Sequence, residues 1–213
     1  MGMLISEQLF PILSGSSEGS GDWALRSIYG LRGAVLADLL LAGRLDLTPG
    51  RDPMMRVIDD TPTNNPILDY VLSQLPTGEG IRISSVIGRG ECSLEDIIAE
   101  HGAVGLPEPD DDGAPEDADP APEPGAGIVD RLIAVLAGKR PATAADQVLL
   151  SILKGLGLGR AVLPSERTGL GWSGLYRRIK EITDTNAPGE PLRTMTDTLA
   201  ALTIIVATVD DNR

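Results

Sequence analysis

The spacing of apolar residues predicts that most of this chain is helical. From Trp23 to Ala42 the apolar side chains cover much of the circumference of a helix, so this segment should be central and mostly buried. Gly43 follows it, as a left-handed residue that ends a helix. Stretches with one apolar face predict shorter helices at Leu4 to Leu13, Pro66 to Leu75, Leu94 to Glu100, Ile128 to Leu136, Ala144 to Leu156, Gly174 to Ile182 and Leu192 to Val209.

Two other segments have a different pattern. Apolar and polar residues alternate on both sides of a turn at Thr48 to Pro53, which predicts two short strands that contain Leu47 and Met55. Ile81 to Ile87 fits either a strand or the first turns of a helix, and both interpretations stay open.

Composition supports a helical core. Only 3% of the residues are aromatic, so the core must rest on Leu, Ile, Val and Ala, which favours helices over a β-sandwich. A chain of 213 residues is long enough for one sizeable core. We therefore predict an all-α fold, a single domain over residues 1–213, in which amphipathic helices wrap central ones and at most a short β-hairpin is added.

The negative charge is concentrated in one segment. The chain has a net charge of −13, and eight acidic residues but no basic residue lie in residues 107–127. Without these eight, 23 acidic and 18 basic residues remain. Because this segment also contains six prolines, we predict an acidic, disordered insert. A net charge of this sign argues against both nucleic acid and an anionic membrane as a non-specific partner, because both need a broad positive field, but here most of the acidity belongs to the one segment.

No pattern in the sequence supports catalysis. Cys92 and the only histidine, His101, form no recognisable signature, and we interpret them as a packed thiol and a solvated side chain. Asp59 and Asp60 are typical of a turn. Structural zinc needs about four nitrogen or sulfur ligands, which Cys92 and His101 cannot supply. We predict no catalytic residues, no metal and no cofactor. A single cysteine rules out an internal disulfide and fits a reducing compartment, and the longest apolar run, Leu199 to Val209, is too short to cross a bilayer. We expect a cytoplasmic protein.

Two local sequences stand out. Gly30 and Gly33 flank Arg32 inside the predicted central helix, where each glycine costs up to about 1 kcal/mol relative to alanine. Either close packing or a special backbone position should compensate. The second sequence, Gly171 to Lys180, mixes aromatic and basic residues, a combination that occurs in base stacking and at membrane interfaces. We favour an amphipathic helix whose arginine stems cover the core.

Several of these residues together resemble the Golgi phosphoprotein 3 family. Trp23 is followed nine residues later by Arg32 within Gly-Leu-Arg-Gly, and an apolar helix then leads to the sequence AGRLDL of residues 42–47. The sequence DDTPTNNPILDYVL is similar to the next family motif, with Asn64 and Asn65 where glycine and aspartate are usual. The resemblance covers about residues 3–75 and, more loosely, 128–209. Arginine outnumbers lysine 15 to 3, as in chains from GC-rich bacterial genomes.

The resemblance implies a non-enzymatic peripheral membrane protein. Eukaryotic relatives bind phosphatidylinositol 4-phosphate and hold glycosyltransferases in the Golgi, and Trp23 and Arg32 correspond to two residues of their headgroup pocket. The implied partner is an anionic, phosphoinositide-like phospholipid headgroup, contacted from the inner face of the membrane. A protein partner is also implied, and the oligomeric state stays open.

Two features of the sequence depart from this implication. On one continuous helix, nine residues correspond to a rotation of about 180° and a rise of about 13 Å. Trp23 and Arg32 can therefore share a pocket only if Trp23 precedes the helix or Gly30 bends it. In addition, Gly88 and Glu91 occupy the positions of the family's second basic pair, and Arg89 is only nearby.

These departures leave an alternative function open. The chain would be a protein-interaction or adaptor module that keeps the fold but has lost the lipid site. Arg32 would then be structural, bonded to a helix C-terminus or to a buried carboxylate such as Asp38 or Asp59.

Overall fold

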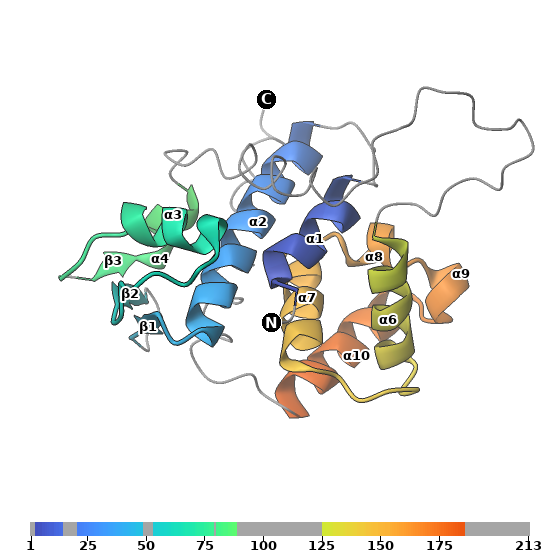
Figure 1. The fold of residues 1–213 in the computed structure, drawn as a ribbon. Helices are drawn as coiled ribbons and strands as arrows, with labels where there is room; N and C mark the ends of the chain where they lie inside the picture. The colour runs from blue at the N-terminus through green and yellow to red at the C-terminus, as the bar shows by residue number, and fades with distance from the viewer. Residues whose placement is uncertain (1–2, 15–20, 49–52, 79, 89–124, 186–213) are drawn as a thin grey trace, which may run out of the picture.

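The predicted, mainly helical architecture is confirmed by the computed structural model of the chain, which describes residues 3–14, 21–48, 53–78, 80–88 and 125–185 (Figure 1). The helices are, in chain order, α1 (Ile5–Ser14), α2 (Gly21–Leu41), α3 (Pro66–Gln74), α4 (Ile83–Gly88), α6 (Ala126–Leu136), α7 (Ala144–Gly155), α8 (Gly159–Val162), α9 (Ser165–Thr168) and α10 (Trp172–Thr185). The strands are β1 (Leu45–Leu47), β2 (Met54–Val57) and β3 (Ile81–Arg82).

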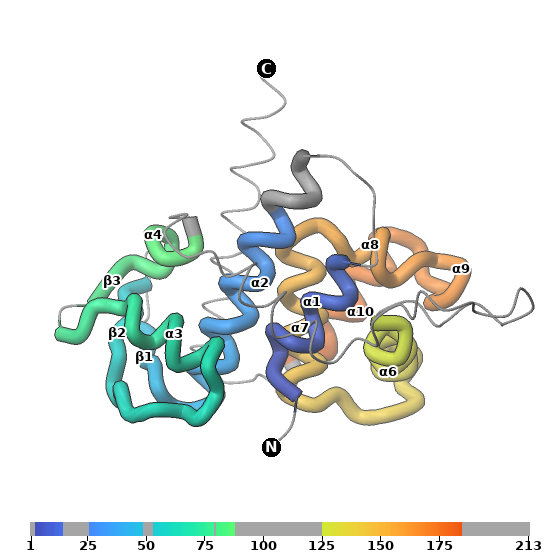
Figure 2. The backbone as a smooth tube through the Cα atoms, turned by 45° about the horizontal axis from the view of Figure 1, so that its top comes forward, coloured from blue at the N-terminus to red at the C-terminus, as the bar shows by residue number. Residues whose placement is uncertain are grey.

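Helix α2 occupies the centre of the described part of the molecule. It lies between the sheet with α3 and α4 on one side and α1, α6, α7 and α10 on the other (Figures 1 and 2). Its residues 31–39 are all buried, so the predicted central helix is confirmed. Gly43 has the expected left-handed backbone, with a φ of 68°.

The sheet is small and antiparallel, in the order β1-β2-β3. Leu47 pairs with Met55, which confirms the two predicted strands, and Met55 in turn pairs with Ile81 of β3. The segment for which strand and helix stayed open contains both, because β3 ends at Arg82 and α4 begins at Ile83. The predicted hairpin is thus extended by a third strand of two residues.

Three charged side chains of α2 satisfy the ends of three other helices. Arg26 Nη1 donates to the carbonyl of Leu156 at the end of α7, at 2.7 Å, and Arg32 Nη1 donates to the carbonyl of Ile87 near the end of α4, at 2.8 Å. Asp38 accepts hydrogen bonds from the first residues of α1. Backbone groups at helix ends have no partner within their own helix, so a buried end needs such contacts.

Asp38 acts as an N-terminal cap supplied by another helix. Its carboxylate accepts from the Ile5 backbone N–H at 2.8 Å and from the Ser6 backbone N–H and hydroxyl at 3.0 and 2.9 Å. Burial raises the pKa of Asp38, and these hydrogen bonds oppose the rise. The carboxylate thus joins α1 to α2 inside the core.

Close packing accounts for Gly30. A Cβ atom at this position would lie 2.6 Å from Leu156 Cδ1 and 3.6 Å from Leu9 Cδ2. Gly30 is not among the residues with positive φ. Of the two explanations left open by the sequence, packing of α2 against the end of α7 therefore holds for Gly30.

Some predictions fall outside the described residues. These are the helix at Leu94 to Glu100, the last helix from Leu192 to Val209, Cys92 and His101, and residues 107–124 of the acidic insert. The end of that predicted insert is helical instead, because α6 begins at Ala126. The prediction of one domain over the whole chain stays a prediction.

We predict that Gly30→Ala lowers the free energy of unfolding. The added methyl group must displace the buried Leu156 side chain, and overpacking of a core costs about 1–3 kcal/mol, whereas the gain in helix propensity is at most about 1 kcal/mol. Urea unfolding measures the difference. Gly127→Ala is the matched control, because a Cβ atom there meets nothing within 4 Å. It should leave stability unchanged or raise it by up to about 1 kcal/mol. A Gly30→Ala protein as stable as wild type would contradict the packing argument.

We also predict that Asp38→Ala destabilises the fold by roughly 2–4 kcal/mol, because each buried donor left without an acceptor costs about 1–3 kcal/mol. Ser6→Ala removes only one of the three donors and should cost about 1 kcal/mol. Thermal unfolding of both variants provides the comparison. Equal losses in the two variants would show that the backbone donors of α1 do not depend on Asp38.

Candidate functional site

Arg32, the proposed phosphate ligand, lies at the contact of α2 with α4. Its residue is only 7% exposed, and its guanidinium donates to the Ile87 carbonyl in the last turn of α4. The contact joins residues 55 positions apart in sequence. Of the structural partners considered for Arg32, a helix C-terminus is therefore observed within the described residues. The carboxylates of Asp38 and Asp59 bind other groups, namely the start of α1 and Arg44.

Trp23, the second predicted site residue, is part of the first turns of α2, and its side chain lies outside the described part of the chain. Because α2 is continuous from Gly21 to Leu41, nine residues again correspond to about 180° of rotation. The two backbone positions therefore lie on opposite faces of the helix. Gly88 is the last residue of α4, and Arg89 and Glu91 lie outside the described residues.

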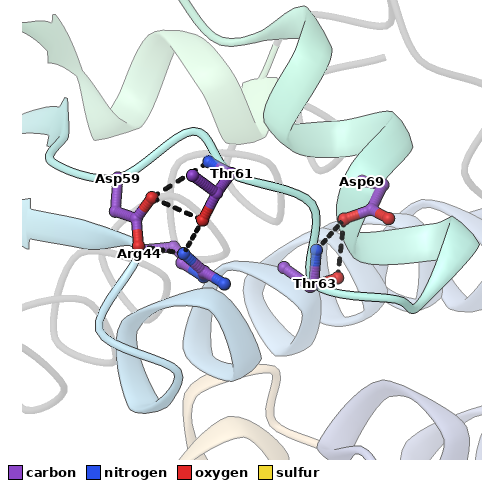
Figure 3. Close-up of polar contacts among 5 residues, drawn as sticks. All are labelled: Arg44, Asp59, Thr61, Thr63 and Asp69. Carbon is purple, nitrogen blue, oxygen red and sulfur yellow. Dashed lines mark hydrogen bonds and ion pairs between the residues drawn. The ribbon is translucent and has the colours of Figure 1, made fainter.

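A cluster of polar residues joins the end of α2 to the loop after β2 (Figure 3). Arg44 pairs with Asp59 and donates to the Thr61 hydroxyl at 2.6 Å. Thr61 in turn donates to Asp59 from its backbone N–H at 2.9 Å and from its hydroxyl at 2.7 Å. The hydrogen bond from the Thr61 backbone is the main cause that lowers the pKa of Asp59, followed by that from its hydroxyl. An ionised carboxylate held in this way is unsuited to transfer protons near neutral pH.

The same loop is fixed to α3 by a second set of contacts (Figure 3). Thr63 donates to Asp69 from its backbone N–H at 2.6 Å and from its hydroxyl at 2.7 Å. The Thr63 hydroxyl, then its backbone N–H, lowers the pKa of Asp69. We name the five residues Arg44, Asp59, Thr61, Thr63 and Asp69 the loop clasp. Sequence reasoning missed it, although the aspartates and threonines of a turn are typical of such local bonds.

The two departures from the family motif in this loop have a physical explanation. Asn64 has a φ of 62°, a left-handed conformation that glycine favours and that asparagine tolerates better than most other residues. Asn65 caps α3, because its side chain accepts from the backbone N–H groups of Ile67 and Leu68 at 3.0 and 3.2 Å. Aspartate and asparagine are both good N-caps. The two asparagines therefore preserve the local structure that glycine and aspartate would give.

The aromatic and basic sequence from Gly171 to Lys180 forms most of α10. Leu175 and Ile179 are buried, and Arg178 Nε donates to the Leu136 carbonyl at the end of α6, at 3.0 Å. The prediction of an amphipathic helix is confirmed, and Arg178 reaches from α10 to the end of α6. Trp172, in contrast, is 57% exposed.

These contacts define a mainly helical protein whose charged residues chiefly hold helix ends and loops in place. Within the described ranges no three His, Cys, Asp or Glu residues are grouped to hold a metal ion. None of the described helices combines the length and the apolar character needed to cross a bilayer.

The comparison with protein families agrees with this class. Residues 7–105 match the family model described as Golgi phosphoprotein 3 (GPP34), so the resemblance seen in the sequence is confirmed over that segment. The segment includes Trp23, Arg32 and the whole loop clasp. Golgi phosphoprotein 3 is not a known enzyme family. No curated protein matches the chain.

We predict that Asp69→Asn makes the protein less sensitive to acid. The pKa of Asp69 is lower in the folded chain than its ordinary value, so its carboxylate stabilises the fold above about pH 4. This contribution is lost as the pH falls through the folded pKa. Asparagine keeps an acceptor for Thr63 but does not titrate. The urea midpoint of the variant should therefore fall less than that of wild type when the pH is lowered from about 6 to about 3.

Asp60→Asn is the control for this experiment. It removes the carboxylate next to Asp59 in the same loop, for which the described residues supply no hydrogen bond, and it should follow wild type. If both variants lose stability as steeply as wild type, Asp69 does not contribute to the acid response.

Proposed function

We propose that the protein is a non-enzymatic peripheral membrane protein that binds an anionic, phosphoinositide-like lipid headgroup through Arg32. The observation that supports this most directly is the family match over residues 7–105, which includes Arg32 in its Gly-Leu-Arg-Gly sequence. The family resemblance assigns this position to a headgroup pocket. The role in Golgi sorting is not part of the proposal.

The setting of Arg32 suits a phosphate ligand in two respects. Its guanidinium is held by the Ile87 carbonyl, so less side-chain freedom is lost when a ligand binds. The planar fork of a guanidinium also matches phosphate geometry and forms charge-assisted bonds. In a site of low exposure, such bonds are screened less than on an open surface.

Trp23 has a separate role in this proposal. Because its backbone position lies on the opposite face of α2 from Arg32, it would not share the phosphate pocket. Its indole would instead contact the membrane boundary, where an amphipathic ring is favoured.

A second function is favoured by the contact between Arg32 and Ile87. The same hydrogen bond, together with burial of the guanidinium, is what a purely structural arginine at a helix C-terminus would show. In that case the protein is a protein-interaction or adaptor module that keeps the fold and has lost the lipid site.

Flotation with vesicles separates the two functions. Phosphatidylcholine vesicles with and without phosphatidylinositol 4-phosphate are mixed with wild type, Arg32→Ala and Arg32→Lys, and melting temperatures are measured in parallel. A charge-assisted bond contributes about 1.5–3 kcal/mol, so Arg32→Ala should reduce phosphoinositide-dependent binding about ten- to hundredfold. Arg32→Lys keeps the charge without the fork and should lie between the two.

Arg56→Ala is the matched control, because it removes the same charge from an exposed pair with Asp46 on the sheet. It should bind vesicles like wild type. If Arg32→Ala lowers the melting temperature but binds lipid like wild type, the adaptor function is supported and lipid binding through Arg32 is contradicted. Failure of wild type to prefer the phosphoinositide vesicles would contradict it as well.

A further inference from the structure

One short turn of the chain lies where three helices meet. Residues 156–158 join α7 to α8, α8 packs against α10, and the end of α7 lies beside α2 (Figure 1). Gly157 has a φ of 72°, in the left-handed region that glycine favours. Arg26 of α2 and Tyr176 of α10 both reach this piece of backbone. We name Arg26, Gly157, Gly159 and Tyr176 the α8 corner.

Arg26 is fixed against the turn by its guanidinium group. Nη1 donates to the Leu156 carbonyl at 2.7 Å, and the same atom lies 2.7 Å from the place that a Cβ atom of Gly157 would take. Glycine at position 157 therefore leaves the room that the guanidinium fills. The side chain is half-buried. A bond to a neutral carbonyl fixes the direction of the guanidinium without neutralising its charge.

Tyr176 approaches the same turn from the other side, with its hydroxyl 3.8 Å from the Cβ position of Gly159. Burial raises the pKa of the Tyr176 hydroxyl, and the positive charge of Arg26 opposes this rise, so the two side chains are close enough to interact electrostatically. The hydroxyl stays protonated at neutral pH and can donate a hydrogen bond. Among the residues that the structure describes, none forms a hydrogen bond with it. A half-buried donor of this kind is suited to a ligand or to water.

The segments that form the α8 corner are basic, in contrast to the net charge of −13 of the whole chain. Residues 147–165 contain Lys154 and Arg160 but no acidic residue, and residues 167–180 contain four basic residues and again no acidic one. Arg160, which directly follows Gly159, is exposed. On α2, the acidic residue nearest to Arg26 in sequence is Asp22, whose side chain lies outside the described part of the chain. An anion at the corner therefore meets mainly cationic surroundings.

We propose that Arg26 and Tyr176 together bind a phosphate group at the α8 corner. The guanidinium offers charge-assisted bonds that match phosphate geometry, and the tyrosine hydroxyl adds a donor from a second helix. The site is separate from Arg32, because six residues along α2 correspond to a rotation of about 240° and Arg32 binds the end of α4 instead. The inference therefore rests neither on Arg32 nor on membrane association.

Trp172 is placed to contact the molecule that carries the phosphate. Its ring lies beside that of Tyr176, with centroids 4.6 Å apart, and the residue is 57% exposed. An exposed aromatic ring can pack against a sugar or polyol ring while its N–H reaches water. The phosphate can belong to a soluble ester or to a lipid headgroup, since both present the same group to Arg26 and Tyr176.

Isothermal titration calorimetry of the full chain tests the proposal at neutral pH and constant ionic strength. The probes are inorganic phosphate, inositol 1-phosphate and acetate. Wild type should bind both phosphates about tenfold or more tightly than acetate, because phosphate carries more charge and more acceptor oxygens. Tyr176→Phe removes only the hydroxyl and should weaken binding of both phosphates about three- to tenfold. Its melting temperature should equal that of wild type, since no described residue bonds to the hydroxyl.

Arg26→Lys is the second variant, because it keeps a charge and a donor for the Leu156 carbonyl but loses the planar fork. It should weaken phosphate binding about tenfold. Trp172→Ala should weaken binding of inositol 1-phosphate more than that of inorganic phosphate.

Two matched controls lie on the other side of α2 (Figure 1). Tyr70→Phe removes a tyrosine hydroxyl from α3, and Arg56→Lys changes an exposed arginine of β2 in the same way as Arg26→Lys. Both should bind phosphate like wild type. Asp22→Asn removes the acidic residue four positions before Arg26 on α2 and should bind phosphate at least as tightly as wild type. Weaker binding by Asp22→Asn would contradict a phosphate at Arg26.

Flotation with phosphatidylcholine vesicles that contain either phosphatidylinositol or phosphatidylinositol 4-phosphate identifies the source of the phosphate. If Tyr176→Phe also loses its preference for the 4-phosphate, the ligand is a lipid headgroup. If it keeps this preference but binds inositol 1-phosphate weakly, the ligand is a soluble ester. Both results support the α8 corner.

The proposal is overturned if Tyr176→Phe and Arg26→Lys bind phosphate like wild type, or if wild type binds phosphate no more tightly than acetate. It is also overturned if Arg32→Ala alone loses phosphate binding, which would place the phosphate at Arg32. Loss of phosphate binding in Tyr176→Phe and Arg26→Lys, but not in Arg32→Ala, supports the α8 corner whatever the vesicles show for Arg32.

Discussion

The described fold depends on the way in which one buried helix satisfies the ends of its neighbours. Arg26, Arg32 and Asp38 are each six residues apart on α2, and six residues correspond to a rotation of about 240°. The three side chains therefore leave the helix in three directions, about 120° apart. They meet the ends of α7, α4 and α1, which surround α2. A charged group in a core is tolerated only with such partners, and a helix end in a core needs them equally.

Close packing and hydrogen bonding act together at the end of α7. The carbonyl of Leu156 accepts from Arg26, while its side chain sets the limit on the size of residue 30. The glycine allows α2 to come close enough for this contact, and the arginine satisfies the helix end that the approach buries. Arg178 of α10, outside the central helix, likewise donates to the Leu136 carbonyl at the end of α6. The excess of arginine over lysine suits this architecture, because a guanidinium is more weakly hydrated than an ammonium group and is the better group for buried contacts.

The features that could be predicted from the sequence are those specified by residues close together along the chain. Helical periodicity identified α2 and the amphipathic helices because each pattern lies within one element. The loop clasp also joins residues close in sequence, and the turn chemistry of its aspartates and threonines is a signal that could have indicated it. The contacts of Arg26 and Arg32 span 130 and 55 residues, so no local pattern specifies them. The prediction for Arg32 went only as far as a choice between a helix end and a carboxylate.

In the proposed function, the need to satisfy helix ends in the core also determines what Arg32 can contribute to lipid binding. A guanidinium that also holds the end of α4 has a fixed direction, so it can select a ligand by geometry but cannot reach far to attract one. Exposed cations such as Arg177 and Lys180 have the opposite properties, because they are solvated and their attraction is screened by salt. At physiological ionic strength the screening length is about 8 Å, so their attraction acts only close to the surface. Association with an anionic bilayer would therefore weaken with added salt, whereas the selectivity given by the buried Arg32 would change little. If Gly88 and Glu91 stand where relatives carry a second basic pair, membrane binding through Arg32 would still be compatible with the sequence, provided that other cations supply the general attraction.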